Sequence, residues 1–470
     1  MAISKLDDVL GDRIERMVRT HHRRRLTRIG HGRAFTPPAG GWADSGAFAP
    51  RDGNRIELLV DGAEVLPRIV ADVEAAGSHV HVAGWFFTPG LVMGHNGPTL
   101  AALLGDAAER VPVRVLAWAG APLPLFHPDR AEVRAIRDLP VRGTRIEMQL
   151  DAAERPMHCH HEKLVIVDDR VAYVGGLDLT TLAGDRFDTS AHDPRGRLGW
   201  HDVCVRLEGP VVADVVDHFR LRWRGELVPA VRAEPLDGPA VHLVRTVPEY
   251  VYSGLPKGEF TILESYLRAL QSAERLVYLE SQFLWSSEVV SVLAAKLRNP
   301  PSDEFRVVVL LPARPNNGGD DPRGLVGVLV DADEGKGRFL ACTLYQPGRG
   351  GGLVYVHAKV GVVDDRWLTI GSANLNEHSL FNDTEVNVVV QDEALARAVR
   401  MRLWGEHLQR DDVDGDPTAL IDEVWRPLAT EQLDRRRKDG FVTHRLTLLP
   451  HVSRRAQSLL GPINGLLVDG

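Results

Sequence analysis

The sequence predicts an α/β protein built from two related lobes around one shared site. Residues 161–178 and 357–374 carry the same polar cassette: His-x-Lys, four residues, Asp, six residues, Gly. Seven of the eighteen aligned positions are identical. Around both copies, short runs rich in Val, Ile and Leu alternate with stretches of helical periodicity, which is the pattern of an α/β fold. A polar site that occurs twice suggests that two halves meet and pool their residues around one substrate.

The first half of the chain alternates between predicted strands and predicted helices. Apolar runs with β-branched residues predict strands at 55–60, 79–87, 111–119 and 200–207. Helical periodicity predicts helices at 62–76 and 210–223, the earlier one with Pro67 in its first turns. The first cassette predicts a β-hairpin that turns at Asp168, Asp169 and Arg170.

The same alternation returns after a Pro-rich polar stretch at 224–240, which predicts a linker. Strands are predicted at 241–246, 275–283, 305–312, 339–346 and 384–390, and helices at 260–273, 286–298 and 394–408. The polar stretch 314–324 is predicted to be a loop that could gate a site. Segments 80–86 and 277–283 align at an offset of 197 residues, against 196 for the cassettes, so the repeat spans a whole lobe.

These patterns divide the chain into five parts: an N-terminal arm (1–50), a first lobe (51–228), a linker (229–240), a second lobe (241–410) and a C-terminal extension (411–470). Eight Arg and three His lie between Arg13 and Arg33. They predict a solvated arm or the polar face of a short helix, with contact to anionic lipid headgroups or phosphates as the alternative. We expect the extension to pack on the second lobe, and we assign it no chemistry.

Composition narrows the class of protein. A hydrophobic content of 44% and a charged content of 26% are those of an ordinary globular protein. The net charge of −8 argues against a general nucleic-acid binder, whose surface would be basic. Three cysteines make no disulfide framework and fit a reducing compartment. The sequence contains no recognisable signal peptide and no run of about 18 apolar residues. We therefore expect a cytoplasmic monomer, with peripheral membrane contact as an option.

The cassette residues suit chemistry at a phosphodiester. Only 7 of the 56 Lys and Arg residues are Lys, yet Lys stands at both 163 and 359. Because strand residues two apart share a face, each Lys is expected to point the same way as His161 or His357. Two ammonium groups match the charge and the oxygens of a phosphodiester, and two imidazoles can provide a nucleophile and an acid.

The other cassette residues allow more than one interpretation. Asp168 and Asp364 either close the hairpins or belong to the catalytic group and brace the lysines. Ser372 and Asn374 could donate hydrogen bonds to phosphate oxygens, and the cassette glycines allow close backbone approach. The segment 157–162, MHCHHE, could suggest a metal site. We expect no metal and no cofactor, because no second ligand cluster is apparent and a neighbouring lysine would repel a divalent cation.

Together, these motifs resemble the phospholipase D superfamily, whose signature is HxK(x)4D(x)6G(S/G)xN in two copies. The resemblance covers residues 55–410 and includes the segments GGLDL, RFDT, WHDV, RLEGP, YLESQF, DTEVNVVV and RLWGEHL. It implies a pseudo-twofold pair of phospholipase D-like α/β sandwich lobes with the active site at their interface. It also implies a mechanism that needs no metal.

The resemblance assigns roles to individual residues. It implies that His161 attacks phosphorus to give a phosphohistidine. His357 would protonate the departing alcohol and then activate water or an acceptor alcohol. An acidic residue orients each histidine in the family, and we assign this role to Asp202 and Glu385. The phosphate oxygens would be held by Lys163, Lys359 and Asn374.

Two positions depart from the family pattern. Asp178 stands where the second copy has Asn374, and a carboxylate cannot donate to phosphate, so Asp178 is expected to orient a neighbour. His378 stands where an Arg is frequent, which puts that position's usual contact in doubt. The full set expected at the substrate is Asn374, Ser372, Gly176, Asp178, Trp85 and Gln282.

We predict an enzyme of the phospholipase D type. It would cleave the headgroup phosphodiester of glycerophospholipids through a phosphohistidine and release phosphatidic acid or a transphosphatidylated lipid. Apolar and aromatic residues at 85–87 and 283–285 support a lipid substrate, although they could equally be lobe core. The alternatives are a cardiolipin-synthase-like transferase and a nuclease or nucleotide phosphodiesterase. The acidic net charge and the lack of basic-aromatic interleaving disfavour nucleic acid as a partner. A non-catalytic scaffold is disfavoured by two complete cassettes.

Overall fold

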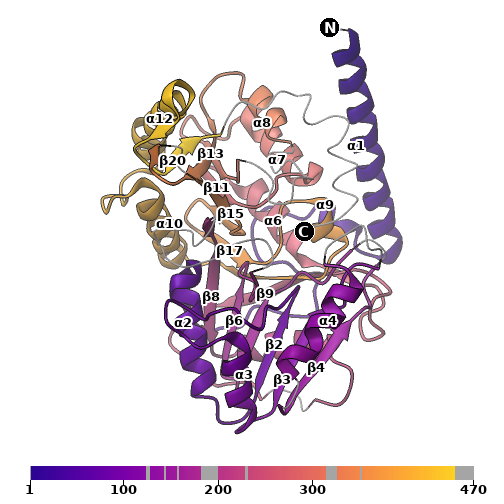
Figure 1. Cartoon of the computed structure of the whole chain (residues 1–470). Helices are drawn as coiled ribbons and strands as arrows, with labels where there is room; N and C mark the ends of the chain where they lie inside the picture. Colours follow the sequence, from indigo (N-terminus) through magenta and orange to yellow (C-terminus); the bar gives the residue numbers. More distant parts are fainter. Residues whose placement is uncertain are drawn as a thin grey trace.

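The computed structural model describes residues 2–122, 128–141, 144–155, 158–181, 199–227, 231–313, 325–349 and 352–449. Figure 1 shows two sheets with helices around them, one built mainly from the first half of the chain and one from the second. The predicted α/β fold class is therefore confirmed. The predicted loop 314–324, the RFDT segment and the C-terminal tail from 450 lie outside the described residues.

The first sheet has seven strands in the order β1-β8-β6-β5-β2-β3-β4. In chain order they are β1 (Arg55–Val60), β2 (Val80–Gly84), β3 (Val113–Trp118), β4 (Ile146–Asp151), β5 (Leu164–Val167), β6 (Val171–Gly175) and β8 (Val203–Glu208). The helices of this half are α2 (Asp61–Glu74), α3 (Leu100–Ala108), α4 (Arg130–Val141) and α5 (Val212–Arg222). Helices α2 and α3 pack on one face of the sheet and α5 packs on the other.

The second sheet repeats this order as β9-β18-β17-β16-β11-β12-β13. These strands are β9 (Val241–Val247), β11 (Leu276–Glu280), β12 (Arg306–Leu310), β13 (Phe339–Tyr345), β16 (Val360–Val363), β17 (Trp367–Gly371) and β18 (Glu385–Val390). The pairs β2–β3–β4 and β11–β12–β13 are parallel, and the strands on the other side of each sheet are antiparallel. The repeat therefore extends to sheet topology, as the two sequence offsets predict.

Additional strands extend the second sheet. They are β10 (Glu259–Phe260), β15 (Leu353–Val356), β7 (Gly199–His201) and β20 (Leu446–Leu448). A separate two-stranded sheet joins β14 (Gly348–Arg349) to β19 (Phe441–Val442). The helices are α6 (Thr261–Ser272), α7 (Ser287–Arg298), α8 (Val326–Asp333), α9 (Glu377–Phe381), α10 (Glu393–Leu408), α11 (Pro417–Leu420), η2 (Ile421–Trp425) and α12 (Arg426–Asp439). Because β20 pairs with β13, the extension packs on the second lobe, as expected.

One apolar core runs between the two sheets. It joins the inner faces of both sheets to α5 and α10, with Phe219 and Trp404 fully buried within it. A second cluster lies between the opposite face of the second sheet and α6, α7 and α8. Because residues of both halves belong to this one core, the structure does not divide the chain into separate domains there. The domain boundaries assigned from the sequence therefore stay predictions.

The predicted strand at 200–207 is wrong in one respect, because the chain changes sheets within it. Residues Gly199–His201 form β7, which pairs in parallel with β15 of the second sheet. Residues Val203–Glu208 form β8 of the first sheet. The crossing point is Asp202, whose amide donates to Asp61 Oδ1 at 3.0 Å and whose carbonyl accepts from the Asp61 amide at 2.8 Å. Propensity along one segment cannot reveal such a crossing, because each partner strand is distant in sequence.

Both cassettes form the predicted hairpins, β5–β6 and β16–β17. Asp168 and Asp169 have φ values of 57° and 53°, and Asp364 and Asp365 are both at 53°. Each loop has three residues, because Val167 pairs with Val171 and Val363 pairs with Trp367. The first two loop residues take positive φ, which Asp tolerates better than most residues. The repeated Asp-Asp pair therefore explains the turn.

The N-terminal stretch is a helix, which the sequence predicts as one of two forms, and it is longer than the short helix expected. Helix α1 spans Ala2–Ile29 and is followed by η1 (Gly32–Phe35). Arg19 and Arg23 both donate to the Glu288 carboxylate on α7, at 2.5–3.0 Å, and Arg25 pairs with Glu249 at 2.8 Å. These ion pairs attach the lower end of α1 to the second lobe (Figure 1). Among the described residues, no helix is long and apolar enough to cross a membrane.

Candidate active site

Each cassette histidine is held through its backbone by the other half of the molecule. The amides of His161 and Glu162 both donate to the Thr384 carbonyl, at 2.9 and 3.1 Å. The amides of His357 and Ala358 donate in the same way to the His201 carbonyl, at 2.8 and 3.1 Å. The His-x-Lys residues directly precede β5 and β16 and do not lie on them, contrary to the prediction. Their positions are therefore set by contacts between the halves.

The ring of each histidine is also paired with a carboxylate from the other half. His161 Nδ1 lies 2.9 Å from Glu385 Oε1, and His357 Nδ1 lies 2.6 Å from Asp202 Oδ2. Both carboxylates are fully buried, and the two imidazoles are 7% and 5% exposed. An ionised carboxylate only accepts hydrogen bonds, so Nδ1 of each ring donates and the lone pair of the neutral ring lies on Nε2. The structure brings the four predicted residues together in crossed pairs.

The residue after the cassette glycine lies against the carboxylate in both halves. It is Ser372 beside Glu385 in one half and Gly176 beside Asp202 in the other. Ser372 Oγ donates to Glu385 Oε2, and Ser379 Oγ donates to Glu385 Oε1 at 2.6 Å. The prediction that Ser372 donates to phosphate is therefore corrected, because its hydroxyl is engaged with Glu385. At the matching position, a Cβ on Gly176 would lie 2.2 Å from Asp202 Oδ1. Gly176 provides room for Asp202, which is the close approach that a glycine allows.

Each lysine donates to the backbone carbonyl of the histidine in its own cassette, and Lys163 also pairs with Asp178. Lys163 Nζ lies 3.2 Å from Asp178 Oδ2 and donates to the His161 carbonyl at 2.5 Å. Lys359 Nζ donates to the His357 carbonyl. Asp178 thus orients a neighbour, and that neighbour is the lysine of its own cassette. Each ammonium group is held beside its histidine and is almost completely buried.

Asn374 and Gln282 lie in one hydrogen-bonded chain. Asn374 Nδ2 donates to Gln282 Oε1 at 3.3 Å, and Gln282 Nε2 donates to Tyr355 Oη at 3.1 Å. The rings of Tyr355 and His357 each lie 4.7 Å from the ring of Trp200. The sequence analysis missed Trp200 and Tyr355 as site residues. The only signal was the position of Trp200 two residues before Asp202.

Trp85 lies in a small buried cluster near the segment that leads to His161. Its ring stacks on Trp118 at 6.1 Å and contacts Phe86 at 6.3 Å, and the cluster includes Cys159. Trp85 is 7% exposed. The structure therefore places Trp85 in the lobe core that the sequence analysis gave as the alternative.

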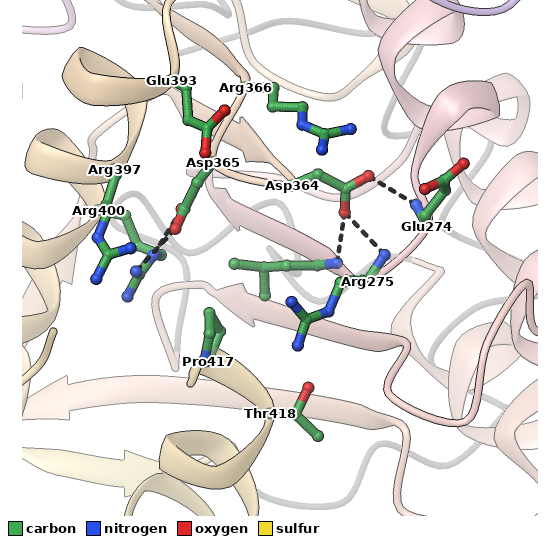
Figure 2. A pocket seen from close by; sticks show the side chains of 11 residues that line it. Glu274, Arg275, Asp364, Asp365, Arg366, Glu393, Arg397, Arg400, Pro417 and Thr418 are labelled. Carbon is green, nitrogen blue, oxygen red and sulfur yellow. Dashed lines mark hydrogen bonds and ion pairs between the residues drawn. The ribbon is translucent and has the colours of Figure 1, made fainter. Parts of the chain in front are cut away.

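The assignment of Asp168 and Asp364 to the catalytic group is wrong. The Asp168 carboxylate accepts the backbone amides of residues 77, 78 and 79 at 2.7–2.9 Å. Asp364 accepts those of residues 274, 275 and 276 at 2.7–2.8 Å (Figure 2). A four-residue strand, about 13 Å long, separates each turn from the lysine of the same cassette. These aspartates tie the hairpin to the loop before the neighbouring strand.

The chain is similar in sequence to phospholipases D and to a cardiolipin synthase. A family model described as "Cardiolipin synthase, PLD-like domain" matches residues 266–405. The chain is 24% identical to phospholipase D A of Dictyostelium discoideum over 469 residues, which is 77% of this chain and 36% of that protein. It is 26% identical to the major cardiolipin synthase ClsA of Bacillus subtilis over 364 residues, 74% of this chain and 67% of that protein.

The chain belongs to the phospholipase D superfamily. Among solved structures, phosphatidylserine synthase of Haemophilus influenzae has a TM-score of 0.55 at 11% identity, covering 76% of this chain and 87% of that one. That likeness concerns the fold. The chain spans 36% of the phospholipase D from Dictyostelium and 65% of phospholipase D alpha 4 from Arabidopsis thaliana.

In this superfamily member, a buried charged network lies beneath the His357 side of the site. His201 Nδ1 is 3.1 Å from Asp61, and its Nε2 is 2.8 Å from Glu280, which also pairs with His407 at 2.9 Å. Burial alone would lower the pKa of His201, but Glu280 and Asp61 raise it well above its usual value. The carbonyl that positions the His357 backbone therefore belongs to a residue whose ring is held by Asp61 and Glu280.

Three groups of described side chains could hold a metal ion. Two of them include the buried His201, and the third consists of His158, His378 and Asp383. One ground for excluding a metal at MHCHHE is therefore wrong, because His378 and Asp383 form a second ligand cluster beside His158. No residue of this third group belongs to the paired histidines and lysines of the site.

Proposed function

We propose that this chain is a phospholipase D-type enzyme that cleaves the headgroup phosphodiester of glycerophospholipids through a phosphohistidine. The observation that carries the proposal is the pair of buried histidines, each with Nδ1 bonded to a carboxylate from the other half. That arrangement leaves each Nε2 as a base or a nucleophile, and the lysine of the same cassette donates to the backbone carbonyl of each histidine.

The first chemical step forms one bond and breaks one. His161 Nε2 attacks phosphorus, and the bond from phosphorus to the headgroup oxygen breaks. Protonated His357 gives its Nε2 proton to that oxygen, so the headgroup leaves as a neutral alcohol. Glu385 stabilises the positive charge that develops on His161, as the buried carboxylate of a hydrolase triad does. The choice of His161 as the nucleophile rests on the superfamily resemblance.

The second step restores the enzyme. His357, now neutral, removes a proton from water or from an acceptor alcohol, whose oxygen attacks phosphorus as the bond to His161 breaks. Asp202 stabilises the imidazolium that forms. Water gives phosphatidic acid, and an alcohol gives a transphosphatidylated lipid. Lys163, Lys359 and Asn374 are proposed to hold the phosphate oxygens through both steps.

Contact with a bilayer is proposed for the exposed face of α1. Arg13, Arg16, Arg24 and Arg28 are all exposed, and at 100° per residue they fall within about 120° of the helix circumference. Each basic residue near an anionic surface contributes about 1 kcal/mol to binding. We therefore propose a peripheral protein that meets anionic lipid through this face. Unchanged binding of an R16E/R24E/R28E variant to phosphatidylglycerol vesicles would remove this part of the proposal.

A cardiolipin-synthase-like transferase is the second candidate. The similarity to the Bacillus subtilis protein and the description of the matching family model favour it. In that reaction the acceptor alcohol would belong to a second lipid, and the same residues would perform the same two steps. The two candidates differ in the acceptor and not in the site.

Phosphorus NMR of vesicles tests both candidates in one experiment. The purified chain is incubated with mixed phospholipids and a little ethanol, and separately with phosphatidylglycerol alone. Phosphatidic acid and phosphatidylethanol in the first sample support the phospholipase, and cardiolipin in the second supports the transferase. If no phospholipid signal changes in either sample, the proposal is wrong, and nucleotides and oligonucleotides become the next substrates to test.

A further inference from the structure

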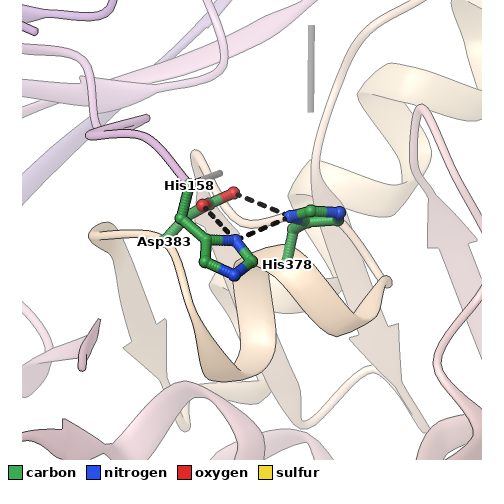
Figure 3. A group of neighbouring side chains, drawn as sticks. All are labelled: His158, His378 and Asp383. Atoms are coloured by element: carbon green, nitrogen blue, oxygen red, sulfur yellow. Dashed lines mark hydrogen bonds and ion pairs between the residues drawn. The ribbon is translucent and has the colours of Figure 1, made fainter. Parts of the chain in front are cut away.

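His158, His378 and Asp383 converge from two distant parts of the chain (Figure 3). His158 lies in the segment that leads to His161, His378 lies on α9, and Asp383 lies two residues before Glu385, the first residue of β18. The two Nδ1 atoms are 3.0 Å apart, and the Asp383 oxygens lie 3.5 Å from His158 Nδ1 and 3.9 Å from His378 Nδ1. We propose that these three side chains bind a divalent transition-metal ion of the zinc class.

The spacing of the donor atoms suits such an ion. Bonds from zinc to imidazole nitrogen or carboxylate oxygen are about 2.0–2.2 Å long, which places neighbouring ligand atoms about 3.0–3.5 Å apart. The 3.0 Å separation of the two Nδ1 atoms and the 3.5 Å separation of His158 Nδ1 from Asp383 Oδ1 fall within this range. The 3.9 Å separation joins His378 Nδ1 to the other oxygen of Asp383, Oδ2, so the carboxylate would have to shift or bind through both oxygens. Two imidazoles and one carboxylate form a donor set that zinc and its first-row neighbours prefer over magnesium or calcium.

Burial leaves one route to the cluster. The side chains of Asp383 and His378 are 0% and 2% exposed, whereas that of His158 is 12% exposed. An ion would therefore enter past His158. In the group of His201, Glu280 and His407, all three side chains are 0% exposed. In the group of Asp61, His201 and Glu406, only Glu406 is exposed, at 7%. This difference in access is why the proposal concerns the His158 cluster.

The position of the cluster gives the ion a structural task. Asp383 Oδ1 also accepts the Cys159 amide at 2.9 Å, and the next residue, Thr384, accepts the amide of His161. An ion bound here would fasten the segment that carries His161 to the segment that carries Glu385. It would reinforce the contact between the halves at the nucleophile without touching the reacting atoms.

The same geometry permits a direct hydrogen bond between the two imidazoles, one Nδ1 donating to the other, with no ion present. Titration of the full chain separates these possibilities. Chelator-treated and dialysed protein is titrated with Zn²⁺ in a calorimeter and with Co²⁺ in a visible spectrophotometer, without lipid. We expect one Zn²⁺ per chain, d–d absorption bands from bound Co²⁺, and a Tm rise of a few degrees at about 100-fold excess over Kd.

Matched variants locate the ion. H158Q and H378Q should bind Zn²⁺ at least tenfold more weakly, and so should D383N, which keeps an oxygen for the Cys159 amide. H79Q removes a partly buried histidine outside the cluster that is paired with Asp169 at 2.8 Å, and it should bind Zn²⁺ as the wild type does. Absence of stoichiometric Zn²⁺ and Co²⁺ binding to the wild type, which needs no variant to fold, would overturn the proposal. Unchanged affinity in H158Q and H378Q would do so as well.

Discussion

The crossed pairing of histidines and carboxylates makes a prediction about which chemical step each carboxylate serves. Glu385 bonds to His161 at 2.9 Å, and Asp202 bonds to His357 at 2.6 Å. Glu385→Gln should therefore impair attack by His161, although Glu385 follows the second cassette in sequence. Asp202→Asn should impair the acid and base work of His357, although Asp202 follows the first.

The magnitude follows from the bonds that are lost. A hydrogen bond to a charged group contributes about 1.5–3 kcal/mol, and each 1.36 kcal/mol corresponds to a factor of ten in rate. The neutral amide of the Gln variant cannot stabilise a cationic His161 in this way. We expect kcat to fall about 10- to 150-fold for each variant, and further if the amide nitrogen faces the ring and changes its tautomer.

The assay uses a phosphatidyl ester of p-nitrophenol, whose leaving group needs no proton near neutral pH. Rapid mixing should give a burst of about one nitrophenolate per D202N chain, followed by slow turnover, because only the second step needs His357. E385Q should give no burst. The control Asp214→Asn removes a buried carboxylate that pairs with Arg51 and Arg232, and it should behave as the wild type. A burst from E385Q and none from D202N would refute the crossed assignment.

Three further predictions concern the surroundings of the site. Ser379→Ala should lower kcat/KM by up to about tenfold, because Glu385 keeps its hydrogen bonds to His161 and Ser372. This loss should be smaller than that of E385Q, and an equal loss in the two variants would contradict the prediction. Asp364→Asn should lower the free energy of unfolding by about 1–3 kcal/mol in urea titrations and leave kcat unchanged wherever the protein is folded. A fall in the kcat of the folded Asp364→Asn variant would restore a catalytic role for Asp364. The raised pKa of His201 gives stability that is fully present below about pH 6.5, its unfolded pKa, and is lost as the pH rises through the folded value. Urea titrations from pH 6 to 10 should show the stability difference between wild type and H201Q shrinking with pH, and a constant difference would show that His201 is neutral.

The α/β class and the repetition of one lobe in the other were predictable from the sequence, whereas the order of the strands was not. Each helix or strand of a lobe has a hydrophobic period that can be recognised within its own segment. Two pairs of segments align at nearly the same offset along the chain, which implied that the sheet occurs twice. Helices α3, α4 and α8 and strand β4 were missed because their patterns are short or mixed with charge. The sequence left the N-terminal stretch as either a solvated arm or a short helix, because the arginines that attach it to Glu288 and Glu249 have partners more than 200 residues away.

The sequence by itself determined the histidines, lysines and acidic residues of this phospholipase D-superfamily chain. Their spacing within each cassette is local, and it occurs twice. Only the tertiary structure decided that Glu385 orients His161 and Asp202 orients His357, because the chain crosses between sheets at Asp202. It also decided that Ser372 serves Glu385 and that His378 meets His158. These contacts join residues that are distant in sequence, or they depend on side-chain directions that packing sets. The local hydrophobic pattern of the sequence contains neither kind of information.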